Sequence, residues 1–347
     1  MTTVETRTNQ VMLMLGALLA LLVAWNAGSQ YVHFSDMQAR LQARFANSTS
    51  TNRRQPPSGP APAETNLILN GAAALALLGA VVSIGIRTRY HMRAKRWEQQ
   101  LAQGRAVQNQ LMPSADVAIP NIHVAAEFLP ALEVGGDLYD VFTTADGRVA
   151  FSLGDVSGKG LPAALLMGMI QGAVRSNAWY RDQTTHEAFA KQLNTMLCNS
   201  SASAKFASLF WGAYDPARAR LTYVSAGHCP GFVVRQSKIV KLDSTGPVLG
   251  LLPQSRFEQG SIDFKHGDLL VLYSDGIVEA ANADGEEFGE DRLEAALARC
   301  TGSSAEEARQ EILKDYRAFL GGTAPEDDLT LLVLEARGAR ASLEVAA

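Results

Sequence analysis

Two long apolar runs near the N-terminus constrain this 347-residue chain more than any other feature. Val11–Ala27 is almost wholly apolar, and Leu67–Ile86 contains no charged residue. Both approach the roughly 17–25 residues that a helix needs to cross a bilayer, and neither shows the polar face of a surface helix. The first run also has the length of a signal-peptide core, but only Arg7 precedes it and no clean cleavage site follows. The sequence therefore predicts transmembrane helices at residues 11–27 and 67–86.

Basic residues directly after the second run set the expected orientation. The cluster consists of Arg87, Arg89, Arg93, Lys95 and Arg96. Positively charged flanks stay on the cytoplasmic side, so residues 1–10 and everything after residue 86 are expected in the cytoplasm. Residues 28–66 then form a short external loop, too poor in apolar residues to fold as a sensor domain.

Residues 87–112 are expected to form a linker helix between the membrane and a folded domain. Trp97–Leu111 is rich in glutamine, and Pro113 ends the helical pattern. Its apolar positions make only a partial stripe, so a coiled coil and a solvated single helix both remain open.

From Asn121 onward, short β-branched runs alternate with turn signals. Several of the runs follow one another closely, which favours antiparallel pairing and an α+β layered fold over a parallel doubly wound sheet. This domain is predicted over residues 113–335, with a tail at 336–347. The expected strands are Ile122–Phe128, Val149–Leu153, Phe206–Tyr214, Arg220–Val224, Gly231–Arg235, Leu269–Tyr273 and Leu329–Leu334, and the expected helices are Pro162–Arg175, His186–Cys198, Glu290–Ala298 and Ala305–Phe319.

Composition excludes several classes of function. A formal net charge of -4 gives no electrostatic footprint for nucleic acid. The three cysteines are far apart in sequence, which argues against a disulfide framework or a cysteine-rich zinc site.

Aspartates stand at the edges of four apolar runs. A single Asp beside Gly usually marks only a turn. However, strand ends that meet at one side of a sheet would gather several carboxylates, which tolerate one another only with a cation between them. Oxygen ligands select Mg²⁺ or Mn²⁺, and several carboxylates have room for two ions. The aspartates concerned are Asp137, Asp140, Asp155, Asp275, Asp327 and Asp328.

The glycine-rich stretch Gly154–Gly160 also resembles a phosphate-binding loop. A Walker A motif would need glycine where Leu153 stands and serine or threonine at 160, so that match fails. Gly158–Ala163 fits a weak dinucleotide pattern, but no acidic residue ends a strand about 20 residues later. The metal interpretation of Asp155 is therefore preferred.

Six motifs in order resemble the SpoIIE-like branch of the PPM-type serine/threonine protein phosphatases. The resemblance covers about Gln108–Glu335 and implies an α-β-β-α sandwich with a two-metal site between the sheet ends. The motifs are Gln108-x-x-Leu111-x-Pro113, GGDLYD at Gly135–Asp140, GDVSGKG at Gly154–Gly160, SAGHCP at Ser225–Pro230, YSDGIVEA at Tyr273–Ala280 and DDLTLL at Asp327–Leu332.

The resemblance also implies a role for each site residue. Asp137 matches the first acidic position, Asp155 the carboxylate that bridges both ions, and Val156 a backbone carbonyl ligand. Asp275 and Asp327 match ligands of the second ion, and Asp328 stands where the wider family often has Asn. The implied metal ligands are thus Asp137, Asp155, Val156, Asp275, Asp327 and Asp328, with Asp155 and Asp275 at the centre of catalysis by two Mn²⁺ or Mg²⁺ ions.

The resemblance leaves the general acid open. In the eukaryotic branch a histidine just after the bridging aspartate protonates the leaving oxygen, but Ser157 stands there in this chain. His228 is an alternative acid, although its motif favours a structural role, and water held at the metal is another. Lys159 is expected to be solvated rather than to bind phosphate.

The resemblance implies a two-pass protein of the bacterial inner membrane, with its catalytic domain in the cytoplasm. It would remove phosphate from serine or threonine of a phosphorylated regulatory protein, such as an anti-sigma factor antagonist, without a phosphoenzyme. A homodimer through the linker helix is a further expectation, and no nucleic-acid partner is expected. The alternative is a non-catalytic membrane-bound scaffold that uses the same fold to bind a partner.

Overall fold

The computed structural model describes residues 25, 28, 31–32, 34–43, 62–113, 118–179, 185–200, 205–236 and 238–337. The chain divides into two compact units, Met1–Glu98 and Gln99–Ala347. The predicted first transmembrane helix at 11–27 lies outside the described residues except for Trp25, as does most of the predicted tail.

Helix α2, Pro62–Leu111, is one helix of 50 residues. It covers both the predicted second transmembrane helix and the predicted linker helix. Its Asn70–Leu111 portion is long and apolar enough to cross a bilayer, and it is the one such helix found within the described ranges. Residues 34–43 of the expected external loop are also helical. The last turns of α2, from Gln99, belong to the second unit.

Two antiparallel sheets form the centre of the second unit. Sheet A has the strand order β1-β2-β11-β10-β7-β8, and sheet B has the order β3-β4-β5-β6-β9. The strands of sheet A are β1 (Ala118–Ile119), β2 (Ile122–Leu129), β7 (Gly231–Arg235), β8 (Lys238–Leu242), β10 (Leu269–Tyr273) and β11 (Leu329–Ala336). The strands of sheet B are β3 (Leu138–Thr143), β4 (Val149–Val156), β5 (Ala207–Asp215), β6 (Arg220–Ala226) and β9 (Gly260–Asp263).

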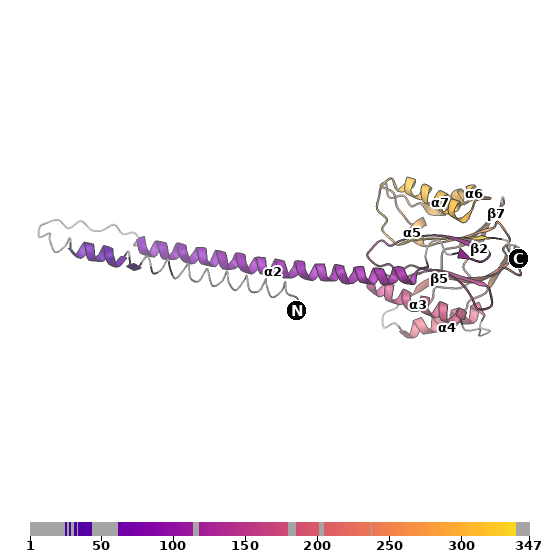
Figure 1. Ribbon diagram of the computed structural model, residues 1–347, viewed down its shortest axis with the longest axis horizontal. Helices are drawn as coiled ribbons and strands as arrows, with labels where there is room; N and C mark the ends of the chain where they lie inside the picture. Colours follow the sequence, from indigo (N-terminus) through magenta and orange to yellow (C-terminus); the bar gives the residue numbers. More distant parts are fainter. Residues whose placement is uncertain are drawn as a thin grey trace, which may run out of the picture. The chain divides into compact units, whose positions relative to one another are not determined.

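Helices cover the outer face of each sheet, as Figure 1 shows. Helices α3 (Leu161–Trp179) and α4 (His186–Ser200) lie against sheet B, while α6 (Gly289–Arg299) and α7 (Ala305–Leu320) lie against sheet A. The short helix α5, Asp275–Val278, directly follows β10. The layers are therefore helix, sheet, sheet and helix, which confirms the predicted α-β-β-α sandwich.

Strand β10 shows how the sequence fills two cores at once. All five of its residues are buried. Leu270 and Leu272 belong to the core between the two sheets, while Leu269, Val271 and Tyr273 belong to the core beneath α6 and α7. Side chains alternate between the faces of a strand, so a continuous apolar run is what a central strand of a four-layer sandwich requires.

Candidate active site

The bridging position predicted at Asp155 lies at the C-terminal end of β4. There β4 pairs with β3 on one side, with Gly154 opposite Leu138, and with β5 on the other, with Asp155 opposite Ser208. This register places the end of β4 beside the start of β3. Asp137, which directly precedes β3, is thereby brought next to Asp155.

Asp137 is almost fully buried, with 1% exposure. Its Oδ2 accepts a hydrogen bond of 2.5 Å from the Thr330 hydroxyl. Thr330 lies in β11 of the opposite sheet, where its backbone N–H donates a 2.9 Å hydrogen bond to Ser274 Oγ. The aspartate of sheet B is thus held by side chains at the ends of β10 and β11.

Asp328 fastens the glycine loop in front of Asp137. Its Oδ1 accepts a hydrogen bond from the Ala131 N–H at 2.8 Å, and its Oδ2 accepts one from the Gly136 N–H at 2.7 Å. A Cβ at Gly135 would lie only 2.3 Å from Asp328 Oδ2, so only glycine lets the loop approach this carboxylate. Asp328, predicted as a metal ligand, therefore has both oxygens engaged by backbone amides.

Asp327 is about half exposed and forms an ion pair of 3.0 Å with Lys159. The same ammonium donates a 2.7 Å hydrogen bond to the Glu326 carbonyl. The expectation that Lys159 is merely solvated is therefore wrong, because it ties the turn after β4 to the loop before β11. The hydrogen bond and the charge of Asp327 raise the pKa of Lys159 above its usual value.

Asp275 opens α5 directly after β10, where Ser274 is the N-cap residue. The next residue, Gly276, packs against the loop before β11, since a Cβ there would lie 2.0 Å from the Asp328 carbonyl oxygen. Asp275 and Asp327 are close enough for the charge of Asp327 to raise the pKa of Asp275.

Crowded carboxylates raise one another's pKa at this end of the sandwich. Burial raises the pKa of Asp155 to about 7, with further contributions from Asp275, Asp327 and Asp328. Burial and then the charge of Asp155 raise the pKa of Asp137 well above its usual value. The pKa of Asp275 is raised first by burial and then by Asp327. Such a cluster is costly without a compensating positive charge.

The donor set fits hard divalent cations. A Cβ at Gly136 would lie 2.8 Å from the Val156 carbonyl oxygen and 3.2 Å from Asp155 Oδ1, so these two oxygens face the same small space. Carboxylate and carbonyl oxygens are the ligands that Mg²⁺ and Mn²⁺ prefer. Within the described residues, however, no three Asp, Glu, His or Cys side chains are already placed to hold one ion. The composition of the site fits such ions, and its side chains would need to turn toward them.

Comparison with known proteins identifies the family. A family model described as Stage II sporulation protein E (SpoIIE) matches residues 145–337, more than half of the chain. The chain belongs to the SpoIIE family.

Two curated relatives of this family member are bacterial proteins. Protein IcfG of Synechocystis sp. is 30% identical over 261 residues, which are 68% of this chain and 41% of that protein. Phosphoserine phosphatase RsbU of Bacillus subtilis is 32% identical over 216 residues, which are 61% of this chain and 63% of that protein. The chain thus spans less than two thirds of either relative.

Solved structures agree on the fold. The SiaA-PP2C domain of Pseudomonas aeruginosa superposes with a TM-score of 0.63 at 19% identity, covering 70% of this chain and 98% of that domain. The RsbU and RsbW domains of Rv1364c from Mycobacterium tuberculosis give a TM-score of 0.57 at 25% identity, covering 67% of this chain and 64% of theirs. The second unit of this SpoIIE family member therefore has the PP2C phosphatase fold.

His228 has the environment of a structural histidine in this SpoIIE domain. It is 5% exposed, and its Nδ1 lies 2.7 Å from Ser208 Oγ. Burial lowers its pKa to about 4, so the ring is neutral near pH 7 and carries no proton to donate as a general acid. Ser157 is occupied as well, because its Oγ accepts a 3.0 Å hydrogen bond from the Phe206 N–H.

Asp140, the second aspartate of the GGDLYD motif, is also structural. It is fully buried, and both of its oxygens accept hydrogen bonds from the Arg175 guanidinium, at 2.6 and 3.0 Å. This pair connects β3 to α3. The motif therefore contains one aspartate that faces the other carboxylates and one that holds the layer behind it.

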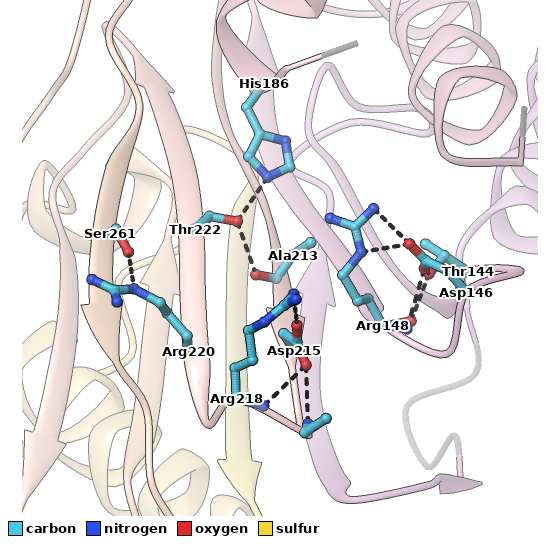
Figure 2. A network of polar contacts seen from close by, with 11 residues as sticks. Thr144, Asp146, Arg148, His186, Ala213, Asp215, Arg218, Arg220, Thr222 and Ser261 are labelled. Carbon is cyan, nitrogen blue, oxygen red and sulfur yellow. Dashed lines mark hydrogen bonds and ion pairs between the residues drawn. The ribbon is translucent and has the colours of Figure 1, made fainter. Parts of the chain in front are cut away.

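A second polar network lies at the opposite end of sheet B and is separate from the carboxylates (Figure 2). His186 Nε2 lies 2.9 Å from Thr222 Oγ1, and the ring packs edge-on against Trp211. Burial, with a contribution from Arg148, lowers the pKa of His186 to about 4. This network connects α4 to the sheet and holds no group suited to catalysis.

Sequence reasoning missed three residues that build the site. Gln108 enters the sequence prediction only as part of a motif, yet its side chain binds both backbone groups of Gly135. Ser274 and Thr330 are not predicted from the sequence, although they join the ends of β10 and β11 beneath Asp137. A polar residue directly beside a motif aspartate, as at Ser274, is the sequence signal that could have indicated them.

Proposed function

We propose that the chain is a metal-dependent phosphatase that hydrolyses phosphoserine and phosphothreonine on a cytoplasmic regulatory protein. The observation that carries this proposal is the meeting of Asp137 and Asp155 from sheet B with Asp275 and Asp327 from sheet A. Membership of the SpoIIE family supports it, as do relatives named phosphoserine phosphatases.

The protein groups in this proposal have separate tasks. Asp155, the Val156 carbonyl and Asp137 would hold metal from the side of sheet B, and Asp275 and Asp327 would hold it from the side of sheet A. Two bound divalent cations would supply an acidified water and neutralise the charge of the phosphate oxygens. Thr330 orients Asp137 by its hydrogen bond, and Asp328 keeps the glycine loop close to the cluster.

The reaction is hydrolysis of a phosphomonoester. Water oxygen bonds to phosphorus while the bond from phosphorus to the serine or threonine oxygen breaks, and that oxygen receives a proton. The products are the free hydroxyl side chain and inorganic phosphate. Since His228 is neutral and buried, the proton would come from water rather than from this histidine.

The test is Mn²⁺-dependent release of phosphate from a phosphoserine peptide by the full chain in detergent. The expected result is activity that Asp155→Asn abolishes and that Asp284→Asn, a change at an exposed turn, leaves intact. Absence of Mn²⁺-stimulated activity, or full activity of Asp155→Asn, would contradict the enzyme hypothesis.

A non-catalytic membrane-bound scaffold is the second candidate. It is favoured by the finding that, in the part of the chain described, no three potential ligands are yet arranged around one point. A scaffold would retain partner binding in Asp155→Asn and would bind no Mn²⁺. Calorimetric titration with Mn²⁺ separates the two candidates without relying on turnover.

We further propose that the protein is anchored in the bacterial inner membrane with its phosphatase domain in the cytoplasm. The support is the apolar run Leu67–Ile86 within α2 and the basic cluster that follows it. A reporter fused after Asn66 is expected outside the cytoplasm. A cytoplasmic reporter would contradict the two-helix topology.

A further inference from the structure

Gln108 is buried in a part of α2 whose neighbouring side chains are exposed. It is 4% exposed, whereas Val107, Asn109 and Gln110 are exposed. Its Nε2 donates a 2.9 Å hydrogen bond to the Gly135 carbonyl, and its Oε1 accepts a 3.1 Å hydrogen bond from the Gly135 N–H. One side chain therefore binds both backbone groups of a single residue, which fixes the position and the rotation of that segment.

The segment held by Gln108 is the approach to the carboxylate cluster. Gly135 and Gly136 directly precede Asp137, and neither glycine has a side chain by which the loop could be anchored. Their backbone groups are held instead by side chains from elsewhere, Gln108 on Gly135 and Asp328 on Gly136. The loop that carries Asp137 is thus fastened to α2 on one side and, on the other, to the residue directly before β11.

Other contacts bring the same two parts of the sequence together. The Tyr139 hydroxyl donates a 2.9 Å hydrogen bond to the Pro113 carbonyl. Val134, 2% exposed, lies against the helix at Gly104, where an added Cβ would be 3.6 Å from its Cγ1. The residues that follow and precede Asp137 therefore both contact the end of α2 or the segment just after it.

The end of α2 is also attached to α3, independently of the loop. Gln171 is 2% exposed, and its Nε2 donates a 2.7 Å hydrogen bond to the Leu111 carbonyl. A Cβ at Gly168 would lie 3.9 Å from Leu111 Cδ1, so the helices are in contact there. The structure thus contains two buried glutamines at the helix end, of which one holds the loop and the other holds α3.

We infer that Gln108 is a positioning residue that sets the metal affinity of the site by placing Asp137 through Gly135. The inference rests on the proposed metal-dependent function. It adds that the last turns of α2 are part of the catalytic machinery, since a small displacement of this helix end moves the Gly135 backbone directly. A partner or signal that shifts the helix end would thereby change metal binding without touching a carboxylate.

The test compares Mn²⁺ affinity, measured by calorimetry on the full chain in detergent, among glutamine variants. Gln108→Met keeps the side-chain length but removes both hydrogen bonds, and the expected result is Mn²⁺ binding weaker by about 10-fold, the lower end for groups that orient metal ligands. Gln108→Glu still accepts from the Gly135 N–H but cannot donate to its carbonyl, so a smaller loss is expected. This milder variant carries the test if Gln108→Met does not fold.

Two matched controls separate the loop contact from general loosening. Gln171→Met removes the tether to α3 and is expected to lower thermal stability while Mn²⁺ affinity stays unchanged. Gln110→Met, at an exposed site on the same helix, is expected to change neither. Equal Mn²⁺ affinity in Gln108→Met and wild type, or an equal loss in Gln171→Met, would overturn the inference. A wild type that binds no Mn²⁺ would overturn the proposed metal site itself, and the inference with it.

Discussion

Replacing Asp328 by Asn tests whether this carboxylate holds the glycine loop. Asparagine keeps one carbonyl oxygen, so one of the two backbone hydrogen bonds survives. The other amide, from Ala131 or Gly136, then faces an NH₂ group instead of an acceptor. A hydrogen bond to a charged group contributes about 1.5–3 kcal/mol. Asp328→Asn is therefore expected to lower the free energy of unfolding by about 2 kcal/mol.

Asp327→Asn is the matched control, because it makes the same chemical change one residue earlier. Its ion pair with Lys159 joins two side chains that are each about half exposed, and such pairs contribute about 0–1 kcal/mol. The expected pattern is a large loss of stability for Asp328→Asn with a small loss for Asp327→Asn.

The assay is urea unfolding of the full chain in detergent, followed by near-ultraviolet circular dichroism, with Mn²⁺ omitted. Omitting the metal keeps ligand binding from contributing to stability. An Asp328→Asn variant as stable as wild type would refute the argument that its two oxygens fasten the loop. A metal affinity lost in Asp328→Asn without loss of stability would instead support the ligand role predicted from the motif.

Three further changes give distinct expectations. Lys159→Gln removes a cation 3.0 Å from Asp327, so Mn²⁺ should bind more tightly in calorimetry while stability changes by at most about 1 kcal/mol. Gly276→Ala places a Cβ 2.0 Å from the Asp328 carbonyl oxygen, so thermal scans should show clear destabilisation. Burial holds the pKa of His186 near 4, below about 6.5 in the unfolded chain. Stability present above pH 6.5 is therefore lost as pH falls toward 4, by up to about 3 kcal/mol, and His186→Gln should lack this part of the urea-unfolding profile.

Each of these changes has a control and a contradicting result. Lys238→Gln alters an exposed lysine and should leave Mn²⁺ binding unchanged, so an equal gain there would remove the argument from Lys159. Gly172→Ala lies in α3 with open space around it and should be neutral or slightly stabilising. Destabilisation of this variant comparable to that of Gly276→Ala would contradict the steric argument. For His186, a constant stability difference between wild type and variant from pH 7 to pH 4 would contradict the depressed pKa.

The strands of the fold could be predicted because most have an apolar run bounded by turns. Gly231–Arg235 and Leu269–Tyr273 agree with β7 and β10 at both ends. Strand β3, Leu138–Thr143, was missed because Asp140 interrupts its apolar pattern. The structure resolves this conflict by pairing the buried Asp140 with Arg175, a contact between positions that are 35 residues apart.

The candidate site was predictable only in part, for a similar reason. Motifs and strand ends indicated which aspartates would meet, since antiparallel register places Asp137 beside Asp155. Sequence could not indicate that Asp328 faces two backbone amides, nor that Lys159 pairs with Asp327, because both depend on loop geometry across the two sheets. The roles of individual carboxylates are set by these tertiary contacts rather than by local spacing.

The contacts that unite the two sheets at the site have a consequence for folding. Gly136 and Asp328 are 192 positions apart in the chain, and Asp137 and Thr330 are 193 apart. Contacts between such distant positions form slowly, because a long loop must close before they contribute any stability. The local hairpins can form before the chain brings β11 to β3. The site is therefore assembled among the last native contacts, and a chain that has not completed its sandwich cannot gather the carboxylates that phosphate hydrolysis would use.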